Sequence, residues 1–445
     1  MFAPVVQALL AAAALTLTVH AQTPVAITGV TVIDGTGRAP QPGTTVLVRD
    51  GRIVAVGRDG TVPIPARTQR IVGRGKYLIA GLWDAHVHLS ALGRDGLPTL
   101  VQHGITSVRD LGGNLATVRT WRDAAERGDV LGPRMRLAGP IVENAFWLKR
   151  VRELGVAGLA RDLEERIPVS TDADAVKAVD SIAAMGVDVL KLRNAPGTSA
   201  YAALLAAAQR KGLRVAGHQP NRSIGLAGAL AAGQRSIEHI EGLGEVESLP
   251  AASRDSIARA YAAAEIWITP TLAASFGRFV AESVTVARVA GTSSDADLSL
   301  VTETLRAFWR AQRELKAYDA PLEQYAGMVT GGLAGLRVLR AAGVKLMAGT
   351  DLGVLTLTPG QSLHQELKLL VDSLGLTPLE AIQAATLEPA RYFGQGDVMG
   401  TVEPGRLADL VLLRANPLAD IRNIGAIDLV MLRGRVVRTT EGGRR

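Results

Sequence analysis

The sequence contains no cysteine among its 445 residues. This absence excludes disulfide bonds, thiolate metal ligands and a cysteine nucleophile. Any bound metal ion must therefore be held by histidine, by a carboxylate or by a modified lysine. Aromatic residues are also scarce, at 4% of the chain, and charged residues make up 20%. Because hydrophobic residues reach 47%, the chain can bury a large core, and disorder is not expected.

A basic stripe with interleaved aromatic residues is also missing. The formal net charge is +7, but Lys and Arg are scattered, and the one dense basic group lies at residues 442–445. We therefore expect no nucleic-acid partner. The expected partner is a small-molecule substrate, and a homo-oligomer is compatible with the sequence.

One hydrophobic run, at residues 1–21, resembles a secretory signal. An apolar stretch is followed by Val19-His20-Ala21, which fits a small-residue cleavage site. No Lys or Arg precedes the run, so a retained membrane anchor is the alternative. No other stretch approaches 18 uninterrupted apolar residues. We expect cleavage after Ala21, a periplasmic or secreted location, and no stable membrane insertion after signal removal.

The two ends of the remaining chain are rich in short β-like runs, and its middle is not. Residues 22–79 and 397–445 contain runs with strand character and hairpin turns at Asp50-Gly51 and Arg433-Gly434. In residues 80–396, strand-like and Ala-rich helical segments alternate. We predict an α/β protein in which a (β/α)8 TIM barrel is joined by a small β-sandwich built from both chain ends.

The predicted barrel has eight strands and two unusually long connections. The strands are expected in GLWDAHVHL, ITSVRD, MRLAGPIV, VDVLKLR, LRVAGH, RSIEH, IWITPTL and VKLMAGTD. The long connections are residues 143–172, after the third strand, and 272–328, after the seventh. Long loops at strand ends commonly form lids or substrate walls.

Two histidines at alternate positions mark the first barrel strand. Side chains alternate along a strand, so His86 and His88 point to the same side, into the barrel mouth. Two imidazoles at this spacing can bind one cation. Three further candidate ligands, His218, His239 and Asp351, also stand where barrel strands end. Because active sites of such barrels are built at these strand ends, the set predicts a metal site.

Lys191 stands in the apolar strand VDVLKLR. Burying an ammonium group is costly, so this lysine is expected to lose its charge. A neutral amine at a metal centre can react with CO2 to give a carbamate, which is an anionic oxygen ligand. The alternative is a lysine at the strand end that extends its amine to water.

These motifs resemble the amidohydrolase superfamily in its binuclear form with a carboxylated lysine. The segments GKYLIAGLWDAHVHL, ITSVRDLGG, AGTDLG, LTPLEAIQAATLEPARYFG and GTVEPGRLADLVLL look like the branch that contains Xaa-Pro and Xaa-Arg/Lys dipeptidases and imidazolonepropionase-related enzymes. The resemblance covers residues 24–438. It is specific to the superfamily and uninformative about the substrate.

The resemblance implies two divalent metal ions, with zinc expected first, although the ligand types also suit Mn, Co or Fe. The more buried ion would be bound by His86, His88, Lys191 and Asp351. The second ion would be bound by Lys191, His218 and His239. A bridging hydroxide would attack the substrate carbonyl, and Asp351 would act as general acid and base by moving a proton to the leaving amine.

Other residues are weaker candidates. Arg193, two positions after Lys191, would bind a substrate carboxylate or form a structural ion pair. His364 would bind substrate or simply begin a helix. Asp110 is expected to cap the helix in NLATVRTW, the alternative being a ligand-orienting role. Phe308 and Trp309 would line the pocket lid or belong to an amphipathic helix.

The predicted function is hydrolysis of an amide bond in a small molecule. Dipeptides, substrates with a C-terminal amino acid and N-acyl amino acids are the expected classes. A cyclic amide or lactone hydrolase is the nearest alternative, and Lys191 speaks against the imidazolonepropionase-like subgroup, which usually lacks the carboxylated lysine. A non-catalytic periplasmic binding protein is a third alternative, although all six ligand positions are filled.

Overall fold

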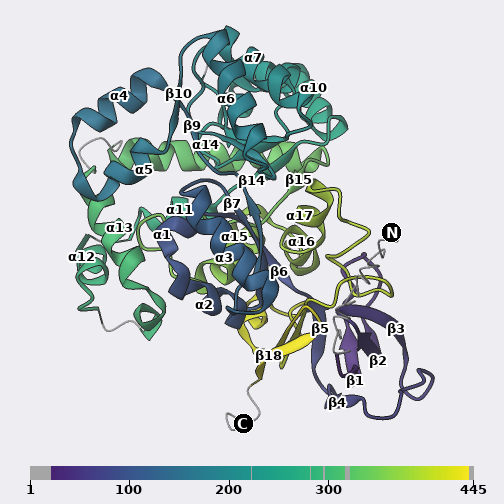
Figure 1. Ribbon diagram of the computed structural model, residues 1–445. Coiled ribbons are helices and arrows are strands. Elements are labelled where there is room, and N and C mark those ends of the chain that lie inside the picture. The colour runs from purple at the N-terminus through teal and green to yellow at the C-terminus, as the bar shows by residue number, and fades with distance from the viewer. Residues whose placement is uncertain (1–21, 222, 281, 294–295, 316–320, 440–445) are drawn as a thin grey trace, which may run out of the picture.

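The computed structural model describes residues 22–221, 223–280, 282–293, 296–315 and 321–439 (Figure 1). The predicted signal and its cleavage after Ala21 lie outside the described residues. Within the described ranges, no helix combines the length and the apolar character needed to cross a membrane.

The described elements alternate through most of the chain. The strands are β1 (Val25–Val32), β2 (Gln41–Arg49), β3 (Arg52–Arg58), β4 (Gln69–Val72), β5 (Tyr77–Ala80), β6 (Leu82–Val87), β7 (Ile105–Asp110), β8 (Arg134–Leu137), β9 (Val142–Asn144), β10 (Ile167–Val169), β11 (Leu190–Leu192), β12 (Val215–His218), β13 (Ser236–Glu238), β14 (Trp267–Thr269), β15 (Lys345–Leu346), β16 (Leu410–Leu413), β17 (Ile427–Leu432) and β18 (Arg435–Thr439). The α-helices are α1 (Leu89–Leu92), α2 (Leu97–Gln102), α3 (Leu115–Arg127), α4 (Ala145–Glu153), α5 (Ala160–Glu164), α6 (Asp172–Ala184), α7 (Thr198–Arg210), α8 (Gly225–Ala232), α9 (Glu245–Ser248), α10 (Ala251–Ala263), α11 (Leu272–Gly277), α12 (Glu282–Ala290), α13 (Glu303–Glu314), α14 (Leu322–Ala341), α15 (Gln361–Leu374), α16 (Pro378–Ala384) and α17 (Leu387–Tyr392). Short 3₁₀ helices include η2 (Ala157–Leu159) and η5 (Ile421–Gly425).

Two parallel sheets form the centre of the molecule. One has three strands in the order β6-β7-β8, and the other has seven in the order β10-β9-β11-β12-β13-β14-β15. The eight strands expected from the sequence are all present, as β6, β7, β8 and β11 to β15. Strands β9 and β10 were not predicted separately, because each has only three residues and neither shows a periodic pattern.

The two parallel sheets are hydrogen bonded to each other on both sides. On one side, the N–H of Ala85 in β6 donates to the carbonyl of Ala348, just after β15, at 2.9 Å. On the other side, the N–H of Asp188, just before β11, donates to the carbonyl of Leu137 in β8 at 2.9 Å. The carboxyl ends of these strands therefore face one common region.

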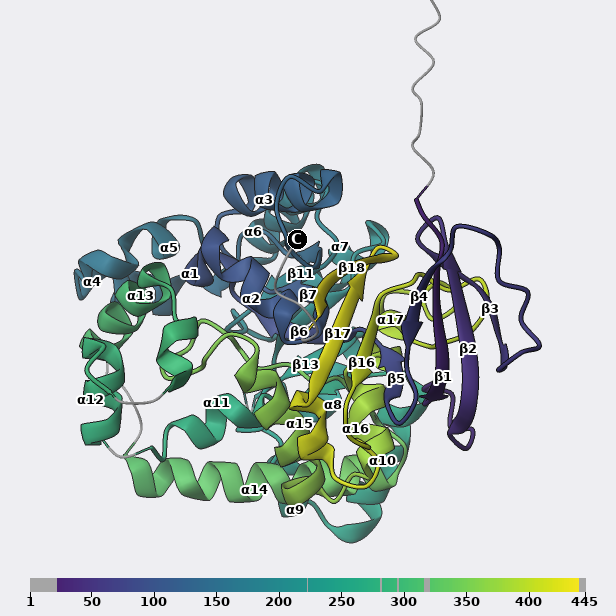
Figure 2. The same cartoon turned by 90° about the horizontal axis from the view of Figure 1, so that it is seen from below.

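Strands from both ends of the chain form a third sheet. Its order is β18-β17-β16-β5-β1-β2-β3, with β4 paired to β1, and Figure 2 shows β16, β17 and β18 beside β5 and the N-terminal strands. The expected turns at Asp50-Gly51 and Arg433-Gly434 have positive φ at all four residues. They also touch, since a Cβ at Gly434 would lie 2.7 Å from the Cα of Gly51. Glycine is therefore required where the two hairpins meet.

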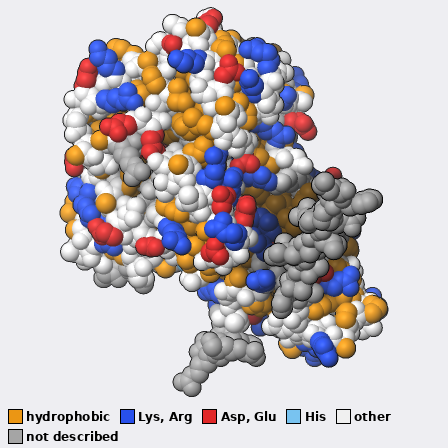
Figure 3. All heavy atoms as spheres, in the orientation of Figure 1, with side chains coloured by type: hydrophobic (Ala, Val, Ile, Leu, Met, Phe, Trp, Pro, Cys, Tyr) orange, Lys and Arg blue, Asp and Glu red, His pale blue; other side chains and the backbone are white. Residues whose placement is uncertain are grey.

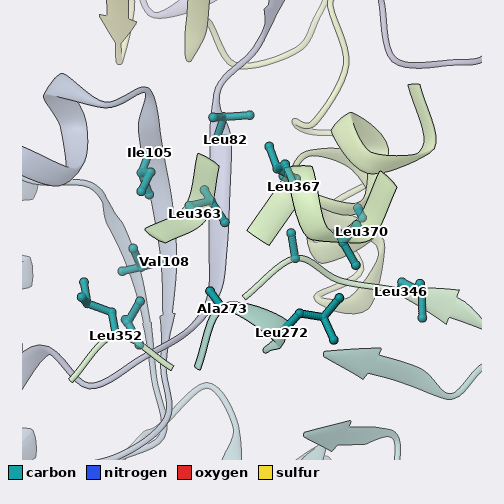
Figure 4. Packing of buried hydrophobic residues seen from close by; sticks show 14 of the residues in the cluster. Leu82, Ile105, Val108, Leu272, Ala273, Leu346, Leu352, Leu363, Leu367 and Leu370 are labelled. Atoms are coloured by element: carbon teal, nitrogen blue, oxygen red, sulfur yellow. The ribbon is translucent and has the colours of Figure 1, made fainter. Parts of the chain in front are cut away.

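Apolar side chains of α15 fill the space behind β6 and β7. Figure 4 shows Leu363, Leu367 and Leu370 of the helix beside Leu82 of β6 and Ile105 of β7, and all five are fully buried. The helix positions are spaced by four and three residues, which places them on one face.

Charged side chains are mixed on the visible surface. On the face of described residues seen in Figure 3, basic and acidic side chains are interspersed, and no continuous basic stripe crosses it.

Glu366 is an ionisable residue in the core, on α15. It is fully buried, and its Oε2 accepts a hydrogen bond from the N–H of Ala273 at 2.7 Å. Its Oε1 has no hydrogen-bond partner among the described residues. Burial raises the pKa of Glu366 to about 8, although the backbone N–H groups of Leu272 and Ala273 oppose the shift. The carboxyl is therefore protonated at neutral pH in the folded protein.

This raised pKa predicts a pH-dependent stability. Between pH 4.5 and 8 the folded protein binds a proton at Glu366 that the unfolded chain has released, so the free energy of unfolding falls as pH rises. The slope from this group is at most about 1.4 kcal/mol per pH unit. Glu366→Gln, which keeps an acceptor for Ala273, should remove this contribution. Urea unfolding at pH 5, 6, 7 and 8 should show that the free energy of unfolding of the variant rises relative to that of the wild type as pH rises. If the difference between the two free energies is the same at every pH, the raised pKa of Glu366 is wrong.

Candidate active site

The six predicted ligands lie at the carboxyl ends of five parallel strands. They are His86 in β6, His88 after it, Lys191 in β11, His218 at the end of β12, His239 directly after β13 and Asp351 shortly after β15. All six line one cavity of about 900 Å³. The structure therefore brings together the whole set that the sequence singled out.

Four of these residues are linked by close contacts. The Oδ1 atom of Asp351 lies 3.3 Å from Nε2 of His86 and 3.1 Å from Nε2 of His88. The Nζ atom of Lys191 lies 3.5 Å from Nε2 of His86. Two ring nitrogens, one amine and one carboxylate oxygen are thus neighbours in the cavity.

The remaining two histidines form a neighbouring pair. The ring centroids of His218 and His239 are 4.5 Å apart. Nδ1 of His239 lies 4.0 Å from Oδ2 of Asp351, so the carboxylate lies between the two groups of ligands.

Three histidines have their Nδ1 atom in a polar contact outside the set of six, although Nδ1 of His239 also lies 4.0 Å from Asp351. The contacts are Nδ1 of His86 to Oε2 of Glu238 at 2.9 Å, Nδ1 of His88 to the carbonyl of Gly112 at 3.1 Å, and Nδ1 of His239 to Oγ1 of Thr271 at 2.8 Å. A partner of this kind on one ring nitrogen leaves the other available as a metal ligand.

For three of the four histidines the pKa shift favours the neutral imidazole, whereas the pKa of His88 is raised because the hydrogen bond and charge of Asp351 outweigh burial. Burial lowers the pKa of His86, His218 and His239. Burial likewise lowers the pKa of Lys191 to about 8, although Glu238 and Asp351 oppose the shift. Neutral imidazoles are metal ligands.

Asp351 remains a carboxylate. Burial alone would raise its pKa, but His86, His88 and His239 around it lower the pKa below the usual range. An anion therefore lies at the centre of the site, where it can accept a proton or bind a cation.

The backbone is strained at two of these ligands. His239 has φ 70° and Asp351 has φ 65°, and Thr271, which contacts the His239 ring, has φ 50°. Left-handed conformations are uncommon for residues with a Cβ, above all for β-branched threonine, and each costs on the order of 1–3 kcal/mol. Such strain is typical of functional sites, where the surrounding structure enforces it.

The donor set fits divalent cations. His86, His239 and Asp351 each offer a ligand atom within 4.8 Å of the others. His88, His218 and Lys191 line the same cavity beside them. Imidazole nitrogen and carboxylate oxygen bind zinc at about 2.0–2.2 Å.

A pair of arginines that share one carboxylate lies near the mouth of the cavity. Nη1 of Arg193 lies 3.4 Å from Oε2 of Glu143, and Nη1 of Arg166 lies 3.0 Å from the same atom. The Arg193 guanidinium also stacks on the Trp147 ring at 4.2 Å. Both arginines line the cavity. The structure therefore shows the ion-pair alternative for Arg193 and places Arg166 beside it in the cavity wall, whereas binding of a substrate carboxylate stays a prediction.

The two long connections meet beside the cavity. Gly158 in η2 packs so closely on α13 that a Cβ at this position would lie 2.5 Å from that of Ala311. Figure 2 shows α4 and α5 next to α13. Phe308 on α13 lines the cavity, whereas Trp309 is buried and donates its Nε1–H to the carbonyl of Val354 at 3.1 Å. Phe308 is therefore part of the cavity wall and Trp309 part of the packed side of the helix, and a lid role for this segment stays a prediction.

Two expectations are changed by the structure. His364 does not line the cavity, because its Nε2–H donates to the carbonyl of His103 at 2.9 Å and its ring lies near Gly425 of η5. Asp110 does not cap the helix in NLATVRTW, since the side chain of Asn114 performs that role for α3. Asp110 instead accepts the N–H of Leu89 at 2.7 Å, directly after His88. It thus supports the loop that carries this ligand.

Comparison with known proteins identifies the class. The sequence profile of the Amidohydrolase family matches residues 77–437, which is most of the chain. The chain therefore belongs to the amidohydrolase family, and the prediction that it is a hydrolase of this family is confirmed.

Individual relatives cover most of the chain. Ochratoxinase from Aspergillus niger is 25% identical over 88% of this chain and 81% of its own length. Imidazolonepropionase from Ralstonia nicotianae is 28% identical over 84% and 87%. A crystal structure of a Xaa-Pro dipeptidase with bound methionine superposes with a TM-score of 0.69 at 22% identity, covering 94% of this chain and all of that one. At this identity the last comparison supports the fold alone.

Proposed function

We propose that the protein is a binuclear metal hydrolase that cleaves an amide bond of a small molecule. The observation that carries the proposal is the convergence of four histidines, a lysine and an aspartate in one cavity at the strand ends. Membership of the amidohydrolase family supports it.

We further infer that the two parallel sheets form one (β/α)8 barrel. Hydrogen bonds from Ala85 to Ala348 and from Asp188 to Leu137 join them on both sides, and helices separate successive strands. The barrel would occupy residues 80–396. The strands of residues 22–79 and 397–445 would form the small β domain.

The residues divide naturally between two cations. His86, His88, Lys191 and Asp351 would hold the first, because their ligand atoms converge within 3.5 Å of a neighbour. Lys191, His218 and His239 would hold the second. Lys191 would serve both as its carbamate, and the lowered pKa of its buried amine favours the reaction with CO2. When bound, two divalent ions activate water and polarise the carbonyl under attack.

Asp351 is placed to move the proton. It is an ionised carboxylate between the two groups of ligands, and it contacts His86 and His88 with one oxygen while the other faces His239. It would accept a proton from the attacking water and donate it to the leaving amine.

Arg193 would hold a carboxylate of the substrate. Its guanidinium forms a long ion pair with Glu143 and stacks on Trp147. A third of the side chain is exposed, and the residue lines the cavity. Arg166 also faces the cavity, and its buried Nε has no hydrogen-bond partner among the described residues. Dipeptides and N-acyl amino acids carry such a carboxylate, so they are the expected substrates.

Arg193→Ala should therefore raise KM for substrates with a free carboxylate. A hydrogen bond to a charged group contributes about 1.5–3 kcal/mol, which corresponds to a rise of roughly 10- to 100-fold, with a smaller effect on kcat. Kinetics on an N-acyl amino acid and on its carboxamide form the test. The variant should lose most of the preference for the free acid, and an unchanged preference would contradict the role of Arg193.

A cyclic amide or lactone is the second candidate substrate class. The match to imidazolonepropionase, whose name denotes an imidazolone ring, favours it. Hydrolysis of cyclic amides without any hydrolysis of linear N-acyl amino acids would select this alternative.

A further inference from the structure

A buried ion pair, which was not predicted from the sequence, lies directly behind His86. Arg109 in β7 and Glu238 in β13 are both buried, at 0% and 1% exposure. Nη2 of Arg109 donates to both carboxylate oxygens of Glu238, at 2.9 and 2.8 Å. The same carboxylate accepts Nδ1–H of His86 at 2.9 Å.

Arg109 is held by further contacts from several strands. Its Nε donates to the carbonyl of Ala85, the residue before His86. Its Nη1 donates to Oγ of Ser236 and its Nη2 to Oγ1 of Thr269, both at 3.0 Å. The guanidinium is thereby fixed relative to β6, β13 and β14, and Glu238 is fixed with it.

We propose that Glu238, held by Arg109, is a positioning residue for His86. Its carboxylate keeps the proton of the imidazole on Nδ1, so that Nε2 is free and points toward Asp351 and Lys191. This inference rests on the proposed function, since it assigns Nε2 of His86 to a metal ion. The arrangement matches the general requirement that a ligating histidine donate its other N–H to a fixed acceptor.

The geometry argues against a purely stabilising role. A buried ion pair is often no more stabilising than apolar residues of the same size, because both charges lose their hydration. Here both members of the pair contact the His86 segment. Glu238 accepts the Nδ1–H of the His86 ring, and Arg109 donates to the backbone carbonyl of Ala85, the residue before it. Both contacts restrict the same ring. His86 therefore enters the site with its orientation already set.

The test measures metal affinity separately from stability. In Glu238→Gln the affinity for Zn²⁺, determined by competition with a chromophoric chelator at pH 7, should fall by about 10- to 100-fold. The matched control is Tyr261→Phe, which removes another buried hydrogen bond, from the Tyr261 hydroxyl to the carbonyl of Leu226 at 2.8 Å, away from the site. The control should lose stability without losing Zn²⁺ affinity.

Each outcome decides the inference. If Glu238→Gln lowers the melting temperature of the metal-free protein but leaves Zn²⁺ affinity unchanged, the pair is structural and the positioning role is wrong. If that variant does not fold, Glu238→Asp keeps the charge but withdraws it from His86, and it should show the same loss of affinity.

An independent measurement needs no variant. The ¹⁵N resonances of His86 in the metal-free wild type should show a proton on Nδ1, and a proton on Nε2 would overturn the inference. A wild type without any Zn²⁺ affinity would refute the proposed function itself. Failure of the proposal on binuclear hydrolysis is thus distinguishable from failure of the positioning role alone.

Discussion

Asp351→Asn is expected to lower kcat by at least about 10²-fold with a much smaller change in KM. Asparagine keeps the shape and one oxygen ligand of Asp351, so at least one metal ion and the substrate should still bind. It cannot accept a proton from the attacking water or return one to the leaving amine. General acid–base catalysis of this kind typically contributes about 10²–10⁴ in rate, and a loss confined to the transition state appears in kcat.

The control for this variant is Asp397→Asn. The Asp397 side chain is fully exposed and pairs with Arg406 away from the site, so this change should leave both kinetic constants unaltered. If Asp351→Asn keeps its metal ions and turns over at the wild-type rate, Asp351 is only a ligand. Another residue must then move the proton, and His364 is not a candidate because it lies outside the cavity.

Lys191→Ala should abolish metal binding at neutral pH and with it nearly all activity. The variant removes a ligand that both cations would share, so the loss should exceed the 10- to 100-fold that is typical for residues that only support a ligand. Metal content after gel filtration and the rate of amide hydrolysis measure the effect. Short carboxylic acids such as acetate should restore part of both, because they can replace the oxygen atoms of the carbamate.

Lys345→Ala is the matched control, since Lys345 is an exposed lysine in another parallel strand, β15. It should retain full metal content. A Lys191→Ala protein that holds two ions and remains active would show that the lysine is not a ligand. An unmodified, protonated Lys191 in a crystal structure with both metal ions present would lead to the same conclusion.

The predicted ligands could be identified from the sequence because each depends on a local rule. Side chains alternate along a strand, so His86 and His88 had to share a side. His218, His239 and Asp351 each stand where an apolar run ends, and parallel strands bring such ends together. The strands themselves were visible because each is a buried apolar run between helical segments.

The support of His86 could not be predicted in the same way. Glu238 stands one residue before a ligand and Arg109 one residue before Asp110, but their pairing depends on which side chains face each other across several strands. The available signal was an arginine and a glutamate inside two short segments with strand character, ITSVRD and RSIEH. Burial of such residues is costly without a partner, so each indicated that the other was needed.

Contacts between distant segments were missed for a similar reason. His364 follows the eighth barrel strand closely, yet its helix α15 turns it toward His103 rather than into the cavity. Arg166 lies in a long connection whose path no periodic pattern defines, and only the structure places it beside Arg193 and Glu143. Positions at or directly after strand ends were therefore predictable, whereas positions on the helices and in the long connections were not.

The most direct test of the binuclear site is the metal content of the wild-type protein. Elemental analysis after gentle purification should find close to two divalent ions per chain, because six ligands converge in one cavity. Removal of the ions by a chelator should abolish amide hydrolysis, and addition of Zn²⁺ should restore it. A content near one ion would indicate a mononuclear site, and a protein that holds no metal and cannot be reconstituted would contradict the proposed function.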